Sequence, residues 1–499
     1  MANSSGLAVN GLIPADFNHA ASGVHYRIFA ADGKAWLSYK RENPPAGREL
    51  DGREELRYFL GSGKRGRTYL FERSGYWFEI PINWYAKRQV WDMAPNYLDA
   101  REAPLTLPVD PGCLHCHFSG AAPALADARN HYAGSPVASG GITCATCHGD
   151  PAAHLASGGK TPMADIDAMP AARRDSICLE CHLEGQAAVV RAGRNLVDFR
   201  PGDDLSDFAY YFVFSGEEGS GGRATSQWEA LLKSQCKRQS GDRLTCTTCH
   251  DPHGSPAPEE RVSFYRQRCL SCHNQPGFAS SHHLENPDCT ACHMARPPSN
   301  DIAHEQVTDH WIRKRVSQQR LPLATTGDLV AVGGFTVSDR DLGLAYAQMA
   351  ARGSRQAGER ALGLLSRAAK LPGSAGDHEL HSQLGFLEQL NGQPQDASAE
   401  YRLALAADPD DALAAGNLAF IEARQHHVDA ARQLWKSVFD HDPVELGAGL
   451  DLAVVECASG DRDSAVATLE RLRTFAPDND RARQMLEAIE AGRQSCNGK

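Results

Sequence analysis

The pattern C-x-x-C-H occurs six times in this chain of 499 residues, and it constrains the fold more than any other feature. The copies use twelve of the fifteen cysteines, all between residues 113 and 292. Such clustering indicates a local cofactor system rather than the disulfide framework of a short secreted chain. The first cysteines are Cys113, Cys144, Cys178, Cys246, Cys269 and Cys289, the second are Cys116, Cys147, Cys181, Cys249, Cys272 and Cys292, and the histidines are His117, His148, His182, His250, His273 and His293.

This spacing suits covalent attachment of haem c. The two thiols bond to the two vinyl groups of one haem, and the adjacent imidazole binds its iron from one face. We therefore expect six haem c groups, each held by one copy of the pattern. Zinc sites and redox disulfides are the alternatives, but neither explains a histidine directly after the second cysteine in all six copies.

Residue counts favour histidine on the opposite face of each iron. Up to residue 315 there are ten histidines outside the copies against five methionines, and axial histidine gives a lower potential than axial methionine. His154, His253 and the pair His282 and His283 lie close to a copy of the pattern. Because three extended residues span only about 10 Å, His253 is expected to bind a neighbouring iron rather than the one that His250 holds.

Aromatic, alternating stretches between residues 20 and 100 predict β-hairpins with turns at Asp32-Gly33 and Ser74-Gly75. From about 105 to 315 the chain is rich in Gly, Pro, Asp and His and poor in helical periodicity. A core built from cofactors would explain that composition.

A repeat of 34 residues follows, in units that start at residues 378, 412 and 446. Small residues at positions 8 and 20, a bulky one at position 24 and proline at position 32 are the pattern of tetratricopeptide helix pairs. An unrelated helical bundle is the alternative. The residues at these four positions are Gly385, Ala419 and Ala453, then Ala397, Ala431 and Ala465, then Tyr401, Trp435 and Leu469, and last Pro409, Pro443 and Pro477.

Together these patterns predict a mainly α fold with an N-terminal β-hairpin segment, an irregular α-rich haem domain and a C-terminal α-solenoid. The expected divisions are a β-rich segment packed on the haem domain (1–100), a hexahaem cytochrome c domain (101–320), a linker (321–340) and a tetratricopeptide repeat domain (341–499).

Over residues 15 to 315 the chain resembles the multihaem cytochromes c with doubled C-x-x-C-H motifs and a C-terminal tetratricopeptide region. The stretches "FNHAASGVHY", "CATCHGDPAAH", "LTCTTCHDPHG", "CTACHMARPP" and "TDHWIRKR" carry this resemblance. It implies that His154, His253 and His310 are distal iron ligands and, on weaker matches, that His19, His283 and His304 are too. His25, His131 and His282 are held in reserve.

The chain departs from that family at its N-terminus. Relatives usually carry a signal peptide and a further C-x-x-C-H ahead of the segment that matches residues 15–30, and neither is visible here, which puts the partner iron of His19 in question. We expect a misplaced start or a trimmed chain rather than a lost haem. The resemblance implies haem attachment after export, so a periplasmic or other extracytoplasmic location is expected.

The charge balance and the hydropathy of the chain limit its possible functions. With 51 basic and 62 acidic residues the chain does not suit nucleic acid as a partner, and no apolar run is long enough to span a membrane. The leading hypothesis is an electron carrier with mostly bis-histidine haems whose redox partner proteins dock on the repeats. The alternative is a multihaem oxidoreductase that converts a small nitrogen or sulfur compound at one five-coordinate haem, so an enzyme role is left open. Cys236, Cys457 and Cys496 are expected to have no functional role.

Overall fold

The computed structural model describes residues 5–63, 66–125, 128–215, 227–278, 282, 286–294, 296, 308–314 and 327–497. The chain forms two compact units. Unit 1 contains Ile142–Ala345 together with Met1–Asn3, and unit 2 combines Ser4–Gly141 with Tyr346–Lys499. The first C-x-x-C-H copy therefore belongs to unit 2 and the other five to unit 1. The four domains expected from the sequence stay a prediction, and the compact units follow other boundaries.

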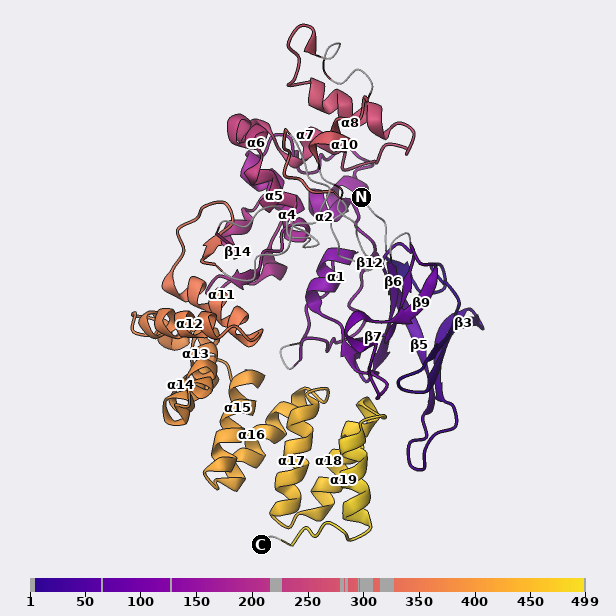
Figure 1. Ribbon diagram of the computed structural model, residues 1–499, viewed down its shortest axis with the longest axis vertical. Coiled ribbons are helices and arrows are strands. Elements are labelled where there is room, and N and C mark those ends of the chain that lie inside the picture. The colour runs from indigo at the N-terminus through magenta and orange to yellow at the C-terminus, as the bar shows by residue number, and fades with distance from the viewer. Residues whose placement is uncertain are drawn as a thin grey trace. The chain divides into compact units, whose positions relative to one another are not determined.

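Unit 2 begins with a large antiparallel sheet whose main path runs in the order β10-β7-β6-β5-β4-β3-β2 (Figure 1). β1 pairs with β5, and β8 pairs with β6 and β9. The strands are β1 (Gly6–Leu7), β2 (Ala15–His19), β3 (Val24–Ala31), β4 (Lys34–Arg41), β5 (Asp51–Leu60), β6 (Gly66–Arg73), β7 (Tyr76–Glu79), β8 (Ile82–Tyr85), β9 (Val90–Met93) and β10 (Leu107–Pro108). Shorter elements complete this part of the unit: η1 (Pro95–Tyr97), α1 (Pro111–His117), β11 (Phe118–Ser119) and β12 (Ser139–Gly140).

Both expected hairpin turns are present in this sheet. Asp32 and Gly33 join β3 to β4, and Ser74 and Gly75 join β6 to β7, all four with positive φ. Two such residues in a row match the right-handed twist of the flanking strands. Alternating side chains of the paired strands then form one buried core, to which Tyr26, Leu37, Phe71 and Phe78 contribute fully buried side chains.

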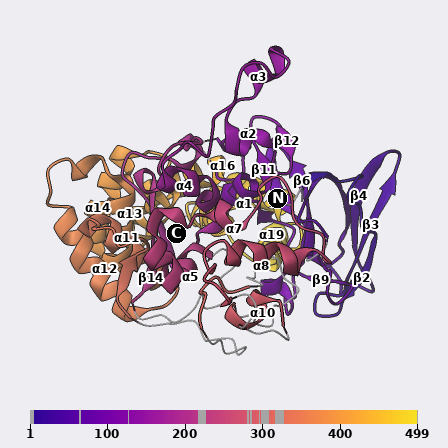
Figure 2. The same cartoon turned by 90° about the horizontal axis from the view of Figure 1, so that it is seen from above.

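The C-terminal half of unit 2 is a stack of antiparallel helix pairs (Figures 1 and 2). A Cβ on Gly385 would lie 2.8 Å from Cε1 of Tyr401, so the small residue at position 8 is what lets the bulky one at position 24 fill the gap between the helices. The helices are α11 (Asp339–Ala351, which begins in unit 1), α12 (Arg355–Ala368), η5 (Ser374–Gly376), α13 (His378–Leu390), α14 (Pro394–Ala407), α15 (Ala412–Arg424), α16 (Val428–His441), α17 (Leu446–Ala458), α18 (Arg462–Phe475) and α19 (Asp480–Glu490).

The sheet and the last helices of unit 2 share a core. Phe475, at the end of α18, packs among the buried side chains of the sheet and meets Tyr76 edge to face at 5.5 Å between ring centres. Beside it, Arg41 of β4 and Asp478 form a two-pronged ion pair with distances of 2.6 and 2.5 Å. Both side chains are buried, at 4% and 5% exposure. Asp478 also accepts the backbone N–H of Ala103 at 2.6 Å.

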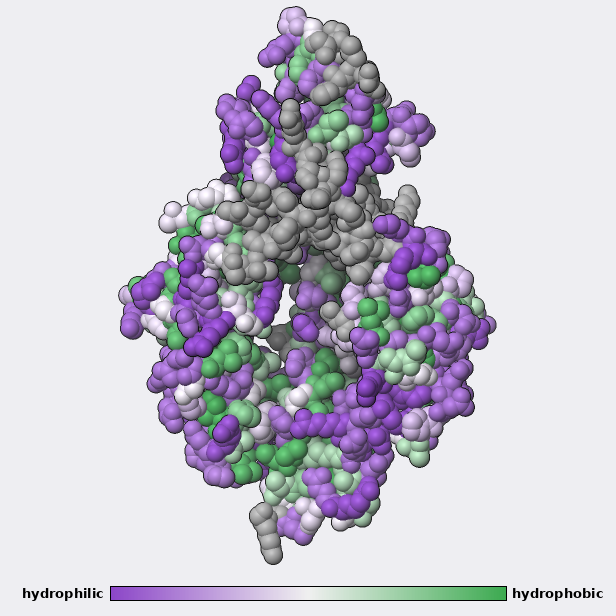
Figure 3. Space-filling model, in the orientation of Figure 1, coloured by the Kyte–Doolittle hydropathy of each residue, from purple (hydrophilic) through white to green (hydrophobic). Residues whose placement is uncertain are grey.

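A disulfide joins Cys457 in α17 to Cys496 in the C-terminal tail. It ties the tail to the last repeat, a structural link that the sequence analysis did not predict. On the face that Figure 3 shows, apolar patches lie over the C-terminal helices, and Leu413, Phe420 and Val454 of α15 and α17 are among the exposed large apolar side chains. Among the described residues, no helix is both long and apolar enough to cross a bilayer.

Unit 1 is built from short elements around a small antiparallel sheet of order β13-β14-β15. Its described strands are β13 (Ala187–Val190), β14 (Ala209–Phe214) and β15 (Leu329–Ala331). Figure 2 shows α3 at the tip of an extended loop. The helices are α2 (Cys144–His148), α3 (Ala152–Ala156), α4 (Ala171–His182), η2 (Leu196–Asp198), η3 (Leu205–Asp207), α5 (Gln227–Lys233), α6 (Gln235–Ser240), η4 (Gly241–Arg243), α7 (Cys246–Cys249), α8 (Arg261–Leu270) and α10 (Cys289–His293).

The expected fold class fits in part. Helix accounts for 44% and strand for 17% of the residues, so "mainly α" understates the N-terminal sheet. The hairpins were visible as local turn signals, but the pairing of successive hairpins into one sheet depends on contacts between distant residues that local patterns do not encode.

Candidate functional site

Each C-x-x-C-H copy lies on or directly after one turn of helix. Residues i, i+3 and i+4 lie on the same face of a helix, so the two thiols and the imidazole of a copy face the same side. In the fourth copy the N–H of His250 donates to the carbonyl of Cys246 at 3.0 Å, and in the fifth His273 donates likewise to Cys269 at 3.0 Å. The helical turn thus extends through the histidine even where the helix proper has ended.

The helices that carry the last three copies have no core of their own. All residues of α7, α8 and α10 are described, and none of their side chains is buried. Folded segments of this size normally bury apolar side chains. A cofactor that the surrounding thiols and imidazoles hold would supply the missing apolar interior, so this observation fits haem.

Three histidine pairs in unit 1 bring one histidine of a copy opposite one from elsewhere in the chain. The ring centres of His148 and His253 lie 6.0 Å apart with planes at 10°. His250 and His310 lie 6.1 Å apart at 29°. His293 faces His282 at 6.0 Å and 16°.

This separation fits a metal ion between the rings. Two imidazoles that bind one ion from opposite sides, each with a metal–nitrogen bond of about 2 Å, have ring centres roughly 6 Å apart. Face-to-face packing without a metal allows closer approach, as between the rings of His131 and Tyr76 at 4.2 Å. The three pairs therefore have the spacing of two axial ligands on one iron.

Hydrogen bonds orient several of these imidazoles. A metal-bound imidazole usually donates its second N–H to a carbonyl, which orients the ring. In four of the site histidines Nδ1 donates to a carbonyl oxygen, which is the arrangement of an imidazole that binds a metal through Nε2. These bonds are His148 to Ala164 (3.0 Å), His293 to Arg313 (2.7 Å), His310 to Thr308 (2.9 Å) and His154 to Thr161 (2.8 Å).

Burial keeps the central imidazoles neutral, which is the form that binds a metal. Burial lowers the pKa of His310 to about 4. Burial, together with the nearby His182, lowers the pKa of His250. The pKa of His182 itself is lowered by burial, against the effect of Gln227, which raises it.

Other expected ligands are not paired with a second histidine by the described contacts. His19 in unit 2 uses both ring nitrogens, with Ser22 Oγ at 2.8 Å and the carbonyl of Leu98 at 2.9 Å. His154 lies on the loop that carries α3, and His273 stacks on Phe278 at 5.5 Å. His283 and His304 fall outside the described residues.

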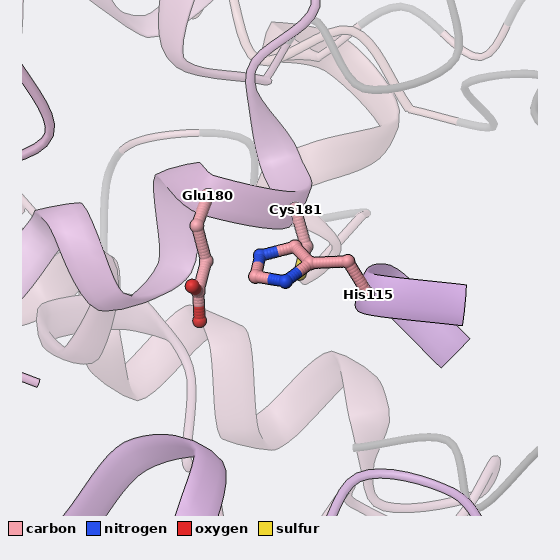
Figure 4. A group of neighbouring side chains, drawn as sticks. All are labelled: His115, Glu180 and Cys181. Carbon is pink, nitrogen blue, oxygen red and sulfur yellow. The ribbon is translucent and has the colours of Figure 1, made fainter. Parts of the chain in front are cut away.

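Partial burial raises the pKa of several anchoring thiols, while Cys144, Cys272 and Cys292 are exposed. In unit 2, partial burial and the charges of Glu79 and Asp110 raise the pKa of Cys113 to about 12. In unit 1, partial burial raises the pKa of Cys147 to about 11 and that of Cys269 to about 12. Figure 4 shows Cys181, one of the anchoring thiols, next to Glu180 on α4, and it shows His115 on α1. Protonated thiols resist oxidation, which favours their survival until haem is attached.

Thiols of different copies also meet within unit 1. The thiol of Cys178 in the third copy lies close enough to that of Cys246 in the fourth for each to shift the pKa of the other, and Cys289 in the sixth copy likewise raises the pKa of Cys269 in the fifth. The attachment points of successive copies are therefore neighbours. Sequence reasoning did not foresee these contacts.

Two further features were missed from the sequence. His282 was only a reserve, and nothing in the adjacent histidines distinguishes it from His283. The disulfide between Cys457 and Cys496 had one signal, since these are the only cysteines beyond the last C-x-x-C-H copy.

Comparison with protein families identifies two segments. Residues 239–278 match the family described as Doubled CXXCH motif, and residues 422–489 match a tetratricopeptide repeat family. The first segment thus has c-type haem-binding character, and the second has the character of a protein-interaction repeat. No curated protein matches the chain.

Several solved structures are similar to about a third of the chain. "MamA AMB-1 P212121" has 21% identity and a TM-score of 0.27, over 31% of this chain and 82% of the other. "Crystal structure of MamA" has 19% identity and a TM-score of 0.27, over 32% and 86%. A tetratricopeptide repeat protein from Parabacteroides merdae ATCC 43184 has 16% identity and a TM-score of 0.28, over 31% and 61%.

Proposed function

We propose that this protein is a multihaem c-type cytochrome that carries electrons through six covalently bound, mostly bis-histidine haems. The observation that carries the proposal is the set of three histidine pairs, each with one histidine from a C-x-x-C-H copy and ring centres 6.0 to 6.1 Å apart. Haem iron held in this way alternates between the ferric and ferrous states and so takes up or releases one electron at a time.

In this proposal the residues of the chain anchor the haems and bind their irons. The twelve cysteines of the copies form thioethers, and the six adjacent histidines bind iron from the proximal face. His253 serves the iron of the second copy, opposite His148, and His310 serves that of the fourth copy, opposite His250. His282 is the proposed partner of His293, while His19, His154, His283 and His304 remain proposed distal ligands for the other irons.

Axial ligands on both faces leave an iron without a free position for a substrate. Electron transfer therefore suits the paired histidines better than conversion of a small molecule. The carbonyls of Ala164 and Arg313 hold the rings of His148 and His293 in place, and a hydrogen bond at Nδ1 makes Nε2 a stronger ligand, which favours the ferric state.

The repeat helices would dock a redox partner protein, for which their exposed apolar patches offer area. We further propose an extracytoplasmic location. Two observations support it: the match to the doubled C-x-x-C-H motif, which is typical of proteins outside the cytoplasm, and the disulfide between Cys457 and Cys496, which is stable in an oxidising compartment.

The first test is a haem count with a ligand-binding measurement. Intact-protein mass and the absorbance of the haem–pyridine complex should give six haems per chain. Carbon monoxide should bind little of the reduced protein. Fewer than six haems would contradict the count, and strong carbon monoxide binding by the wild type would favour the oxidoreductase instead.

His253→Ala tests the assignment of a single ligand. The variant should keep the wild-type haem count while one iron becomes high-spin and binds carbon monoxide. His426, an exposed histidine of the repeats, offers a matched control, since His426→Ala should change neither quantity.

A variant that lacks the second copy's cysteines identifies which iron loses its distal ligand in His253→Ala. When Cys144 and Cys147 are both replaced by Ala, the second copy should load no haem. Adding His253→Ala to that background should then create no further carbon monoxide site. A new site in that background would show that His253 serves a different iron.

A further inference from the structure

Asp175 is a buried carboxylate at the contact between two C-x-x-C-H copies. It lies in α4, three residues before Cys178, so both side chains project from the same face of that helix. Asp175 is buried, with 2% of the residue exposed. Its Oδ1 accepts the backbone N–H of Cys246 at 3.0 Å. Cys246 is the first residue of α7, so the carboxylate fastens the start of the fourth copy to the helix of the third.

The same carboxylate acts on both thiols at this contact. The thiols of Cys178 and Cys246 are close enough to shift each other's pKa. The pKa of the Cys246 thiol is raised, first by Cys178 and by partial burial and further by the charge of Asp175. The pKa of Cys178 is lowered by Cys246, against partial burial and the charge of Asp175, which both act to raise it. Asp175 is therefore close to the points at which two different haems would be attached.

We infer that Asp175 is a positioning residue that holds the attachment segments of the third and fourth copies together, and that its negative charge lowers the reduction potentials of the two haems bound there. The inference rests on the proposed function. A negative charge near a haem favours the ferric state, and net charge and burial are among the protein's means of setting a haem potential. A buried carboxylate is screened less by solvent than an exposed one.

Asp175→Asn removes the negative charge but keeps the hydrogen bond, because the amide oxygen can still accept the N–H of Cys246. Redox potentiometry followed by haem absorbance should show two of the one-electron transitions moved to more positive potential. A unit charge close to an iron changes the oxidation equilibrium by about tenfold or more, which corresponds to 59 mV for a one-electron couple. Asp198→Asn is the matched control, because it removes the same charge from an exposed position of unit 1, and it should move no transition by that amount.

Asp175→Ala removes the acceptor as well as the charge. Peptide mapping by mass spectrometry should then find haem missing from the third or the fourth copy and present in the others. Loss of haem from every copy would overturn the positioning role, since the contact is local. Unchanged potentials in Asp175→Asn, or an equal shift of all transitions, would overturn the effect of the charge.

The two proposals fail in distinguishable ways. A wild-type protein without haem on the third and fourth copies contradicts the proposed function. A wild-type protein with both haems present, whose potentials do not respond to Asp175→Asn, contradicts only the role of Asp175.

Discussion

Asp478→Ala should strongly destabilise unit 2. The substitution leaves the Arg41 guanidinium buried without its counter-charge, with only 4% of the side chain exposed. It also removes the acceptor of the Ala103 N–H. Breaking one side of a buried ion pair costs about 3–5 kcal/mol, so we expect the free energy of unfolding to fall by about that amount. Urea unfolding followed by circular dichroism at neutral pH measures it.

The control is an exposed ion pair between β4 and β5. Lys40 and Asp51 form an ion pair at 3.0 Å whose side chains are 66% and 70% exposed, and exposed pairs contribute about 0–1 kcal/mol. Asp51→Ala should therefore have little effect. A loss below about 1 kcal/mol in Asp478→Ala would refute the reasoning that the sheet and the last helices are fastened by this pair.

An apolar replacement of the whole pair is a further check. The double variant Arg41→Met with Asp478→Leu leaves no unpaired charge, and such replacements are often neutral. It should be more stable than Asp478→Ala alone. If it were equally unstable, the loss would reflect packing around the pair rather than the buried charge.

Two further predictions concern the repeats. Cys457→Ser should lower the free energy of unfolding by about 2–4 kcal/mol, because the disulfide closes a loop between residues 39 apart; reduced wild type should behave in the same way. His381 contacts Glu400 Oε2 at 2.5 Å through Nδ1 and the carbonyl of Ser374 at 3.0 Å through Nε2, and both partners are acceptors, so the protonated ring satisfies both contacts. Its pKa is raised by Glu400, so the stabilisation is present below the unfolded pKa of about 6.5 and lost as the pH rises through the higher folded pKa. The urea midpoint should fall over that range in the wild type and fall less in His381→Gln.

Local sequence patterns predicted much of this molecule. The spacing of cysteine and histidine within each copy identifies the attachment segments, because one helical turn is enough to bring the three side chains to one face. The repeat of 34 residues is also local, and the match over residues 422–489 confirms it. The turns at Asp32-Gly33 and Ser74-Gly75 needed only the left-handed backbone that those residues tolerate.

Contacts between segments that are distant in the sequence could not be predicted from such local patterns. Arg41 and Asp478 are 437 residues apart, and neither lies in a recognisable motif. His148 belongs to the second copy and His253 follows the fourth, and the sequence did not show which iron each distal candidate would serve. Which of the adjacent histidines 282 and 283 turns toward His293 depends on backbone direction, which neither periodicity nor composition reports.

The shared core of sheet and repeats has a consequence for the order in which the chain can fold. Synthesis proceeds from the N-terminus, so residues 4–141 emerge first, yet Phe475, which packs in the core of their sheet, is made after every C-x-x-C-H copy. The segment with the last five copies is thus an insertion within a unit that cannot close until the chain is nearly finished. During that interval the sheet lacks part of its core. The cysteines and histidines of the inserted segment are therefore synthesised before unit 2, whose two parts flank this segment in the sequence, can fold completely.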